Sequence, residues 1–68
     1  MNTAIFLADG FEEIEGLTVV DMFRRAGISI QTVSISDSLT VTGSHDIKVQ
    51  ADCLLADFDF NTVEMLIL

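Results

Sequence analysis

An apolar run that ends at an Asp-Gly break and continues into three carboxylates constrains the fold of this chain most strongly. Residues 3–8 are mostly apolar and do not alternate, which is typical of a central strand that is covered on both faces. The Asp-Gly pair predicts a tight turn, after which Glu12, Glu13 and Glu15 open an amphipathic segment. Ligands of open α/β sheets bind at the carboxyl ends of the strands, so Glu15 is a candidate functional acid. A solvated carboxylate at a helix start would show the same pattern, and this alternative stays open.

Residues 12–26 predict an amphipathic helix, because their apolar side chains recur at helical spacing. Asp9 and Glu12 have the spacing of an N-cap and its capping-box partner, and Gly27 is a natural stop. The apolar positions cover more than one face of this helix. The surplus predicts a second contact, either with another element or across an oligomer interface, and Gly16 would allow a close approach there.

The middle of the chain predicts a second strand followed by a small hairpin. Residues 28–35 form the strand, which would run parallel to the first one in a βαβ unit. Residues 39–42 and 47–51 alternate in polarity around a Gly-Ser turn and predict a hairpin beside the parallel sheet. Asp52 is expected to cap a short helical turn over residues 53–56.

Residues 63–68 predict a third strand that is almost wholly apolar. A parallel strand of this kind needs helices over both faces of its sheet, whereas the chain offers one long helix. A lone core of this size also stabilises a fold by only about 3–5 kcal/mol. We therefore expect Leu68 to be a cut end. Residues 1–68 would be the N-terminal portion of a single α/β domain, with the remainder in a separate or missing segment.

The charge balance and the cysteine count exclude several classes of function. Acidic side chains outnumber basic ones by 11 to 3, giving a net charge of −8. Nucleic acid and anionic membranes are disfavoured as partners, because neutralising phosphate needs clustered Lys and Arg. No apolar run approaches the roughly 20 residues that span a bilayer. With one Cys, no zinc spacing and no phosphate loop, we predict no disulfide, metal or cofactor, and a cytoplasmic location.

Several other polar side chains have structural explanations. Cys53 is predicted to be an inert core thiol because its neighbours are apolar, although a position after a helix cap would favour a reactive one. His45 is predicted to be a surface turn residue, with pocket lining or subunit contact as alternatives. Asp21 and Arg25 are spaced to form a surface ion pair, and Glu13 is expected to stabilise the helix start.

Two stretches of the chain resemble a known family. Residues 5–15, IFLADGFEEIE, followed by residues 20–28, VDMFRRAGI, resemble the opening of the ThiJ/PfpI superfamily. The nearest branch contains the Parkinson-associated DJ protein and the bacterial chaperone/deglycase proteins. The likeness continues through residues 45–47 and Asp52 into residues 63–68. It covers the whole chain but only the opening part of a family domain, and its most specific motifs are Gly-x-Glu-Glu-x-Glu and Arg-Arg-Ala-Gly.

The resemblance implies a flavodoxin-like parallel sheet of the class I glutamine amidotransferase type, of which this chain holds the first part. It also implies a nucleophilic cysteine on a strand-to-helix elbow. Cys53 does not align with that nucleophile, so the implied partner is a complementary C-terminal segment that carries it. Glu15 matches the family carboxyl that hydrogen-bonds the thiolate. Arg25 matches a basic residue near the pocket and the dimer contact, and the helix over 12–26 matches a dimerisation helix, which implies a homodimer.

For the completed protein, the resemblance implies glyoxalase- or deglycase-type chemistry on 2-oxoaldehydes or their adducts, or a protective chaperone or redox-sensing role. The chain alone is not expected to be catalytic. His45 stands where close relatives often carry Arg, which departs from the family pattern. Two alternatives stay open. One is a non-catalytic oligomerising module that uses the helix only for assembly, and the other is a PfpI-type hydrolase of peptides or amides.

Overall fold

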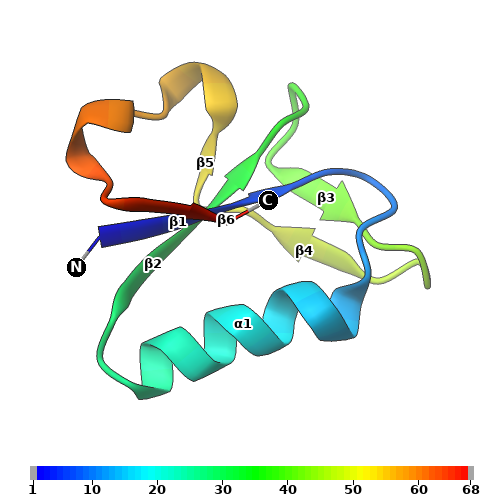
Figure 1. Ribbon diagram of the computed structural model, residues 1–68. Helices are drawn as coiled ribbons and strands as arrows, with labels where there is room; N and C mark the ends of the chain where they lie inside the picture. The colour runs from blue at the N-terminus through cyan, green and yellow to red at the C-terminus, as the bar shows by residue number, and fades with distance from the viewer. Residues whose placement is uncertain (1, 68) are drawn as a thin grey trace.

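Figure 1 shows a four-stranded parallel sheet with a helix packed against it in the computed structural model, which describes residues 2–67. The elements follow the chain in the order β1 (Asn2–Leu7), α1 (Glu13–Arg25), β2 (Ser29–Ser34), β3 (Thr40–Thr42), β4 (Lys48–Gln50), β5 (Cys53–Leu54), the 3₁₀ turns η1 (Leu55–Asp57) and η2 (Phe60–Thr62), and β6 (Met65–Ile67). The predicted helix, strands and hairpin are confirmed, with boundaries that differ by one or two residues. The predicted end of the last strand, Leu68, lies outside the described residues.

The sheet has the strand order β5-β2-β1-β6, and every neighbouring pair runs parallel. β1 pairs with β2 over its whole length, from Asn2 opposite Ser29 to Leu7 opposite Ser34. β6 pairs with the other edge of β1, where Ile67 lies opposite Ile5. Because all strands point the same way, their carboxyl ends meet at one edge of the sheet. The α/β class and the parallel βαβ unit expected from the sequence are confirmed.

Different material covers the two faces of the sheet, as Figure 1 shows. α1 lies below the sheet in this view, and Ile5 and Leu7 of β1 belong to the buried core that the helix covers. Phe6 points to the opposite face because side chains alternate along a strand. There it makes edge-to-face contacts with Phe58 and Phe60, with ring centroids 5.8 and 6.1 Å away. The unbroken apolar run of β1 therefore reflects a strand that is covered on both sides.

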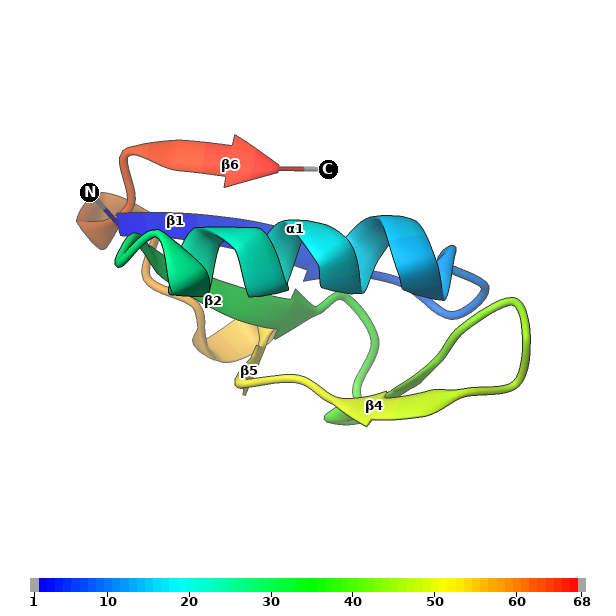
Figure 2. The same cartoon turned by 90° about the horizontal axis from the view of Figure 1, so that it is seen from below.

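β3 and β4 form a separate antiparallel hairpin, in which Val41 lies opposite Val49. Val41 is 1% exposed and belongs to the same core as β1 and α1. Figure 2 shows the hairpin on the β2–β5 side of the molecule, away from β6. The hairpin thus closes one side of the core rather than projecting from it.

The two ends of α1 were predicted with unequal success. The predicted capping box is wrong, because Glu12 is the N-cap and its side chain makes no capping hydrogen bond. The Asp9 carboxylate accepts a hydrogen bond from the backbone N–H of Thr42 at 3.0 Å, so the hairpin uses the expected capping group. The stop at Gly27 is confirmed. This residue has φ +76°, and the N–H of Ile28 donates to the carbonyl of Phe23, which completes a Schellman motif.

The helical turn predicted over residues 53–56 is also wrong, since β5 forms there and the first 3₁₀ turn starts only at Leu55. The cause lies in Asp52, whose backbone N–H donates to the carbonyl of Thr32 at 2.9 Å. Its carboxylate accepts the N–H of Thr32, also at 2.9 Å. Asp52 therefore binds the edge of β2 instead of capping a helix, and the chain leaves it as a strand.

Candidate functional site

A cavity of about 350 Å³ opens at the carboxyl ends of β1 and β6, beside the first half of α1. It is lined mainly by apolar side chains and by two carboxylates, namely Ile5, Phe6, Leu7, Phe11, Glu12, Glu15, Gly16, Val19 and Ile67. A cavity at this edge of a parallel sheet has the position at which α/β proteins bind ligands. Glu15 and Gly16, both predicted as site residues, line it together.

Glu15 reaches this cavity because of its place in the first turn of α1. Successive helical residues point about 100° apart, so three neighbours here have three different surroundings. Glu13 is 5% exposed, Ile14 is 75% exposed, and Glu15 is exposed at the cavity rim. The backbone thus presents one acid to the interior and one to the cavity.

Gly16 lies where α1 packs closely on the cavity wall. A Cβ atom at this position would lie 3.1 Å from Cδ2 of Phe11 and 3.7 Å from Cδ2 of Leu7. The structure places Gly16 against β1 and the turn that follows β1, whereas a close approach at a second contact of α1 remains a prediction.

Glu13, which was expected to stabilise the helix start, instead binds the turn of the hairpin. Its Oε2 accepts the backbone N–H groups of His45 at 2.7 Å and Ile47 at 3.3 Å. Its Oε1 lies 2.9 Å from Nδ1 of His45 and 3.4 Å from Oγ of Ser44. The carboxylate is therefore saturated with hydrogen bonds from a segment more than 30 residues away in the sequence.

We call the contact between Glu13 and His45 the acid–imidazole pair. Glu12 is a third member of the same cluster. Oε1 of Glu12 lies 3.2 Å from the same Nδ1 of His45, although its side chain is 42% exposed. The ligand-type atoms of Glu12, Glu13 and His45 all lie within 4.8 Å of one another. Because the Glu13 oxygens already accept four hydrogen bonds, the geometry is that of a hydrogen-bonded ion pair rather than of a site for a cation.

The contacts of the acid–imidazole pair shift the pKa of both partners. Burial alone would raise the pKa of Glu13, but hydrogen bonds from the His45 side chain and from backbone N–H groups outweigh it and lower the pKa from 4.5 to about 2. The hydrogen bond to Glu13 and the charges of Glu12 and Glu13 raise the pKa of His45 above 6.5, against a smaller effect of burial. The pair is therefore ionised on both sides at mildly acidic pH.

Arg25 lies near the other end of α1 and is not among the residues that line the cavity. Its Nε lies 3.1 Å from Oδ2 of Asp21, and both side chains are largely exposed. The predicted surface ion pair is thus confirmed. A contact of Arg25 with a second subunit remains a prediction.

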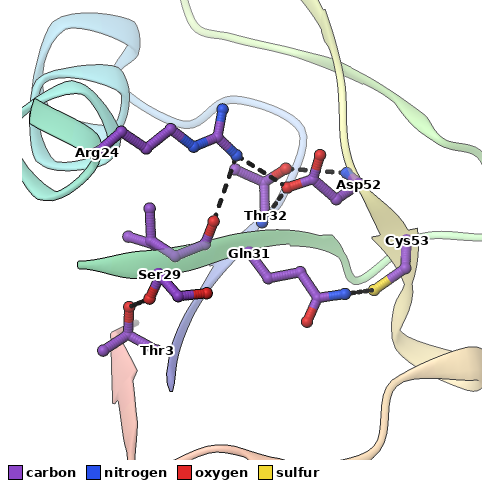
Figure 3. A network of polar contacts seen from close by, with 8 residues as sticks. Thr3, Arg24, Ser29, Gln31, Thr32, Asp52 and Cys53 are labelled. Atoms are coloured by element: carbon purple, nitrogen blue, oxygen red, sulfur yellow. Dashed lines mark hydrogen bonds and ion pairs between the residues drawn. The ribbon is translucent and has the colours of Figure 1, made fainter. Parts of the chain in front are cut away.

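A second polar network joins the carboxyl end of α1 to β2 and β5, as Figure 3 shows. Nη2 of Arg24 donates to Oδ2 of Asp52 at 3.1 Å and to the carbonyl of Ile30 at 3.3 Å. The carboxylate of Asp52 also accepts the N–H of Thr32. No local sequence pattern predicts this link, because Arg24 and Asp52 are 28 positions apart.

Cys53 lies at the edge of the same network, where its sulfur is 3.6 Å from Nε2 of Gln31. Burial raises the pKa of the Cys53 thiol, and the negative charges of Asp52 and Asp57 raise it further. A thiol in these surroundings is a poor nucleophile, because the thiolate is the reactive form. These surroundings agree with the predicted inert role, but Cys53 is half-buried on the edge strand β5 rather than part of the core.

Comparison with known proteins identifies the chain. The DJ-1/PfpI family model matches residues 1–68. Protein DJ-1 homolog B of Arabidopsis thaliana is 32% identical over 91% of this chain and 14% of its own length. YraA of Bacillus subtilis, whose name provisionally describes a cysteine protease, is 31% identical over 96% of this chain and 38% of its own length. The chain belongs to the DJ-1/PfpI family.

Solved structures agree with this assignment. The crystal structure of a cysteine-to-alanine mutant of STM1931, a DJ-1 superfamily protein of Salmonella typhimurium, matches with a TM-score of 0.80 and 38% identity. The match covers 82% of this chain and 30% of STM1931. The chain thus spans well under half the length of the relatives it matches. No helix among residues 2–67 is both long and apolar enough to cross a membrane.

Proposed function

We propose that this chain supplies Glu15 and one wall of a cysteine-centred site, which a C-terminal segment with an elbow cysteine completes. Glu15 would hydrogen-bond the thiolate and pass a proton during attack on a 2-oxoaldehyde or its adduct, as in glyoxalase or deglycase chemistry. A protective chaperone or redox-sensing role would use the same thiol. The free cysteine and the absence of a predicted disulfide favour a reducing, cytoplasmic setting.

One observation supports this proposal above the others. Glu15, the residue matched to the family acid, lines a mainly apolar cavity at the carboxyl ends of β1 and β6. An apolar cavity with few polar groups is the usual form of a site for a small substrate. A carboxyl group on its rim can reach a thiol that enters from the neighbouring part of the sheet.

The test replaces Glu15 by Gln in this chain supplied with the segment that carries the elbow cysteine. Loss of a positioned proton donor should lower methylglyoxal turnover by roughly 100-fold or more. The rate of thiol oxidation by peroxide should change in the same variant, because the thiolate loses its hydrogen-bond partner.

Glu12→Gln is the matched control, because Glu12 lines the same cavity but does not match the family acid. This variant should keep most of the turnover. Unchanged turnover and unchanged thiol oxidation in Glu15→Gln would contradict the catalytic proposal and favour a role in assembly alone.

We propose further that α1 forms a homodimer contact. Ile14 and Met22 are 75% and 62% exposed and lie two turns apart, so they share one face of the helix. Replacing both by Glu should convert a dimer into a monomer in sedimentation velocity. Arg25→Ala, at the end of the same helix, would show whether that residue takes part. A wild-type monomer, or a double variant that still dimerises, would contradict this contact.

A second candidate activity is hydrolysis of peptides or amides by the completed site. The observation that favours it is the likeness to YraA, whose name provisionally describes a cysteine protease. Cleavage of a fluorogenic peptide that depends on the elbow cysteine, without turnover of methylglyoxal, would support this activity over the first one.

A further inference from the structure

We propose that His45 is a proton-controlled latch, which holds the turn of the β3–β4 hairpin against the start of α1 when its imidazole is charged and releases part of that hold when it is neutral. The proposal does not rest on the proposed catalytic role of Glu15. It assigns a function to a cluster that the cavity at the sheet edge does not explain.

The geometry places two carboxylates around one ring nitrogen. Nδ1 of His45 lies 2.9 Å from Oε1 of Glu13 and 3.2 Å from Oε1 of Glu12. A neutral imidazole can donate at most one hydrogen bond from Nδ1 and offers no charge to either acid. The charged form adds an electrostatic attraction to both carboxylates, of which its single positive charge offsets one. The proton on His45 therefore decides how strongly α1 and the turn attract each other.

Glu13 and His45 differ in their access to solvent. His45 can therefore change its protonation state while Glu13 keeps its position. The side chain of Glu13 is 6% exposed, whereas that of His45 is 68% exposed. Protons can therefore reach the imidazole directly from solvent while the carboxylate stays in place. When His45 is neutral, the backbone N–H groups of His45 and Ile47 still bind Oε2 of Glu13, so the turn loosens without detaching.

The other charged groups around the turn do not substitute for His45. Nζ of Lys48 on the same hairpin lies 3.7 Å from Oδ1 of Asp46, and both side chains are largely exposed. Asp9, before the helix, binds the N–H of Thr42. Within residues 2–67, no arginine or lysine side chain forms an ion pair with Glu12 or Glu13.

The direction of the pH dependence follows from both partners. The pKa of His45 is raised above 6.5 by Glu13 and Glu12, so its contribution is complete below pH 6.5 and is lost as the pH rises through the raised value. The pKa of Glu13 is lowered to about 2, so its contribution is complete above pH 4.5 and is lost as the pH falls toward 2. The latch is strongest between these limits, from about pH 4.5 to 6.5.

The experiment is an NMR titration of this chain, isotopically labelled and supplied with an unlabelled segment that completes the domain, so that His45 is the only labelled histidine and its ring signal needs no assignment. The measured pKa of His45 should lie above 6.5 in the wild type and fall toward 6.5 in Glu13→Gln, where the charge of Glu12 still raises it. Amide hydrogen exchange is then measured one pH unit on either side of the measured pKa. The protection factor of the Ile47 amide should fall roughly fivefold or more on the alkaline side.

Two variants and one internal control separate a latch from a merely structural contact. His45→Arg keeps its charge over this pH range, so the protection factor of the Ile47 amide should no longer change with pH. His45→Gln has no charge, so this protection factor should also be independent of pH but lower. The Thr42 amide, bound to Asp9 in the same hairpin, should not respond. An unshifted His45 pKa, or the same Ile47 protection on both sides of it, would overturn the proposal.

Discussion

The two ends of α1 are held by the same kind of contact in different surroundings. At the amino end, Glu13 on the helix accepts the backbone N–H groups of His45 and Ile47. At the carboxyl end the direction is reversed, because Asp52 from outside the helix accepts the N–H of Thr32 and the guanidinium of Arg24. In both places a carboxylate binds a backbone donor from a segment that is distant in sequence.

The two contacts, which we call the Glu13 anchor and the Asp52 anchor, differ in how deeply their side chains are buried. The Glu13 side chain is 6% exposed, while those of Asp52 and Arg24 are 44% and 55% exposed. Water can enter the half-exposed position of a lost Asp52 carboxylate more readily than the closed position of Glu13, so we expect the loss of Glu13 to cost more. The comparison teaches that solvent access decides how much each anchor contributes, and the following variants test that ranking.

Glu13→Ala should have the largest effect on stability. It removes the acceptor of two backbone N–H groups in a place that water reaches poorly, and we expect the melting temperature of the protein to fall by on the order of 15 °C. Circular dichroism during heating measures it. Glu12→Ala is the control and should lower the melting temperature only slightly, because Glu12 is partly exposed and makes one contact in the cluster. Equal effects of the two variants would break the comparison.

Gly43→Ala should come second, because it attacks the same anchor from the hairpin. A Cβ atom at Gly43 would overlap the Glu13 carboxylate, so the acid must move and lose part of its hydrogen bonds. We expect a fall in melting temperature of roughly 10 °C. In a Glu13→Ala background the same substitution should cost little, and a double-mutant cycle measures this coupling. Additive effects would show that Gly43 is required for another reason.

Asp52→Ala should destabilise the protein less than either change at the amino end. It removes one hydrogen bond to Thr32 and a half-exposed ion pair, together about 1 kcal/mol. That loss corresponds to a fall of roughly 5 °C in melting temperature for a chain of this size. Asp52→Asn, which keeps an acceptor for the Thr32 amide, should recover most of it. An effect as large as that of Glu13→Ala would show that exposure does not rank the two anchors.

The comparison also separates what the sequence predicts from what it cannot. The helix, its stop at Gly27 and the parallel strands depend on local periodicity and on backbone preferences, so they could be predicted from neighbouring residues. The helix start and the segment after Asp52 could not. At both places an aspartate that could cap a nearby helix binds a distant backbone N–H group instead. Asp9 binds the N–H of Thr42, and Asp52 binds the N–H of Thr32.

The site shows the same division. Glu15 could be proposed because the strand and the turn before it locate the carboxyl edge of a parallel sheet. The pairing of Glu13 with His45 has no local signal, since the two residues are 32 positions apart and meet only when the hairpin folds against α1. Its only trace in the sequence is a histidine with acids elsewhere, a pattern that many surface turns share.

Arg25→Ala should have the smallest effect and sets the lower end of the ranking. Arg25 and Asp21 form an ion pair on one helix, with side chains that are 80% and 64% exposed. Such pairs contribute about 0.3–0.5 kcal/mol, which corresponds to a fall of roughly 2 °C in melting temperature. Salt screens exposed charges, so the difference from the wild type should disappear in about 1 M NaCl, whereas the effect of Glu13→Ala should persist. A loss at Arg25 that is large and insensitive to salt would mean that this side chain is buried in an assembly, as expected if it lies in the dimer contact.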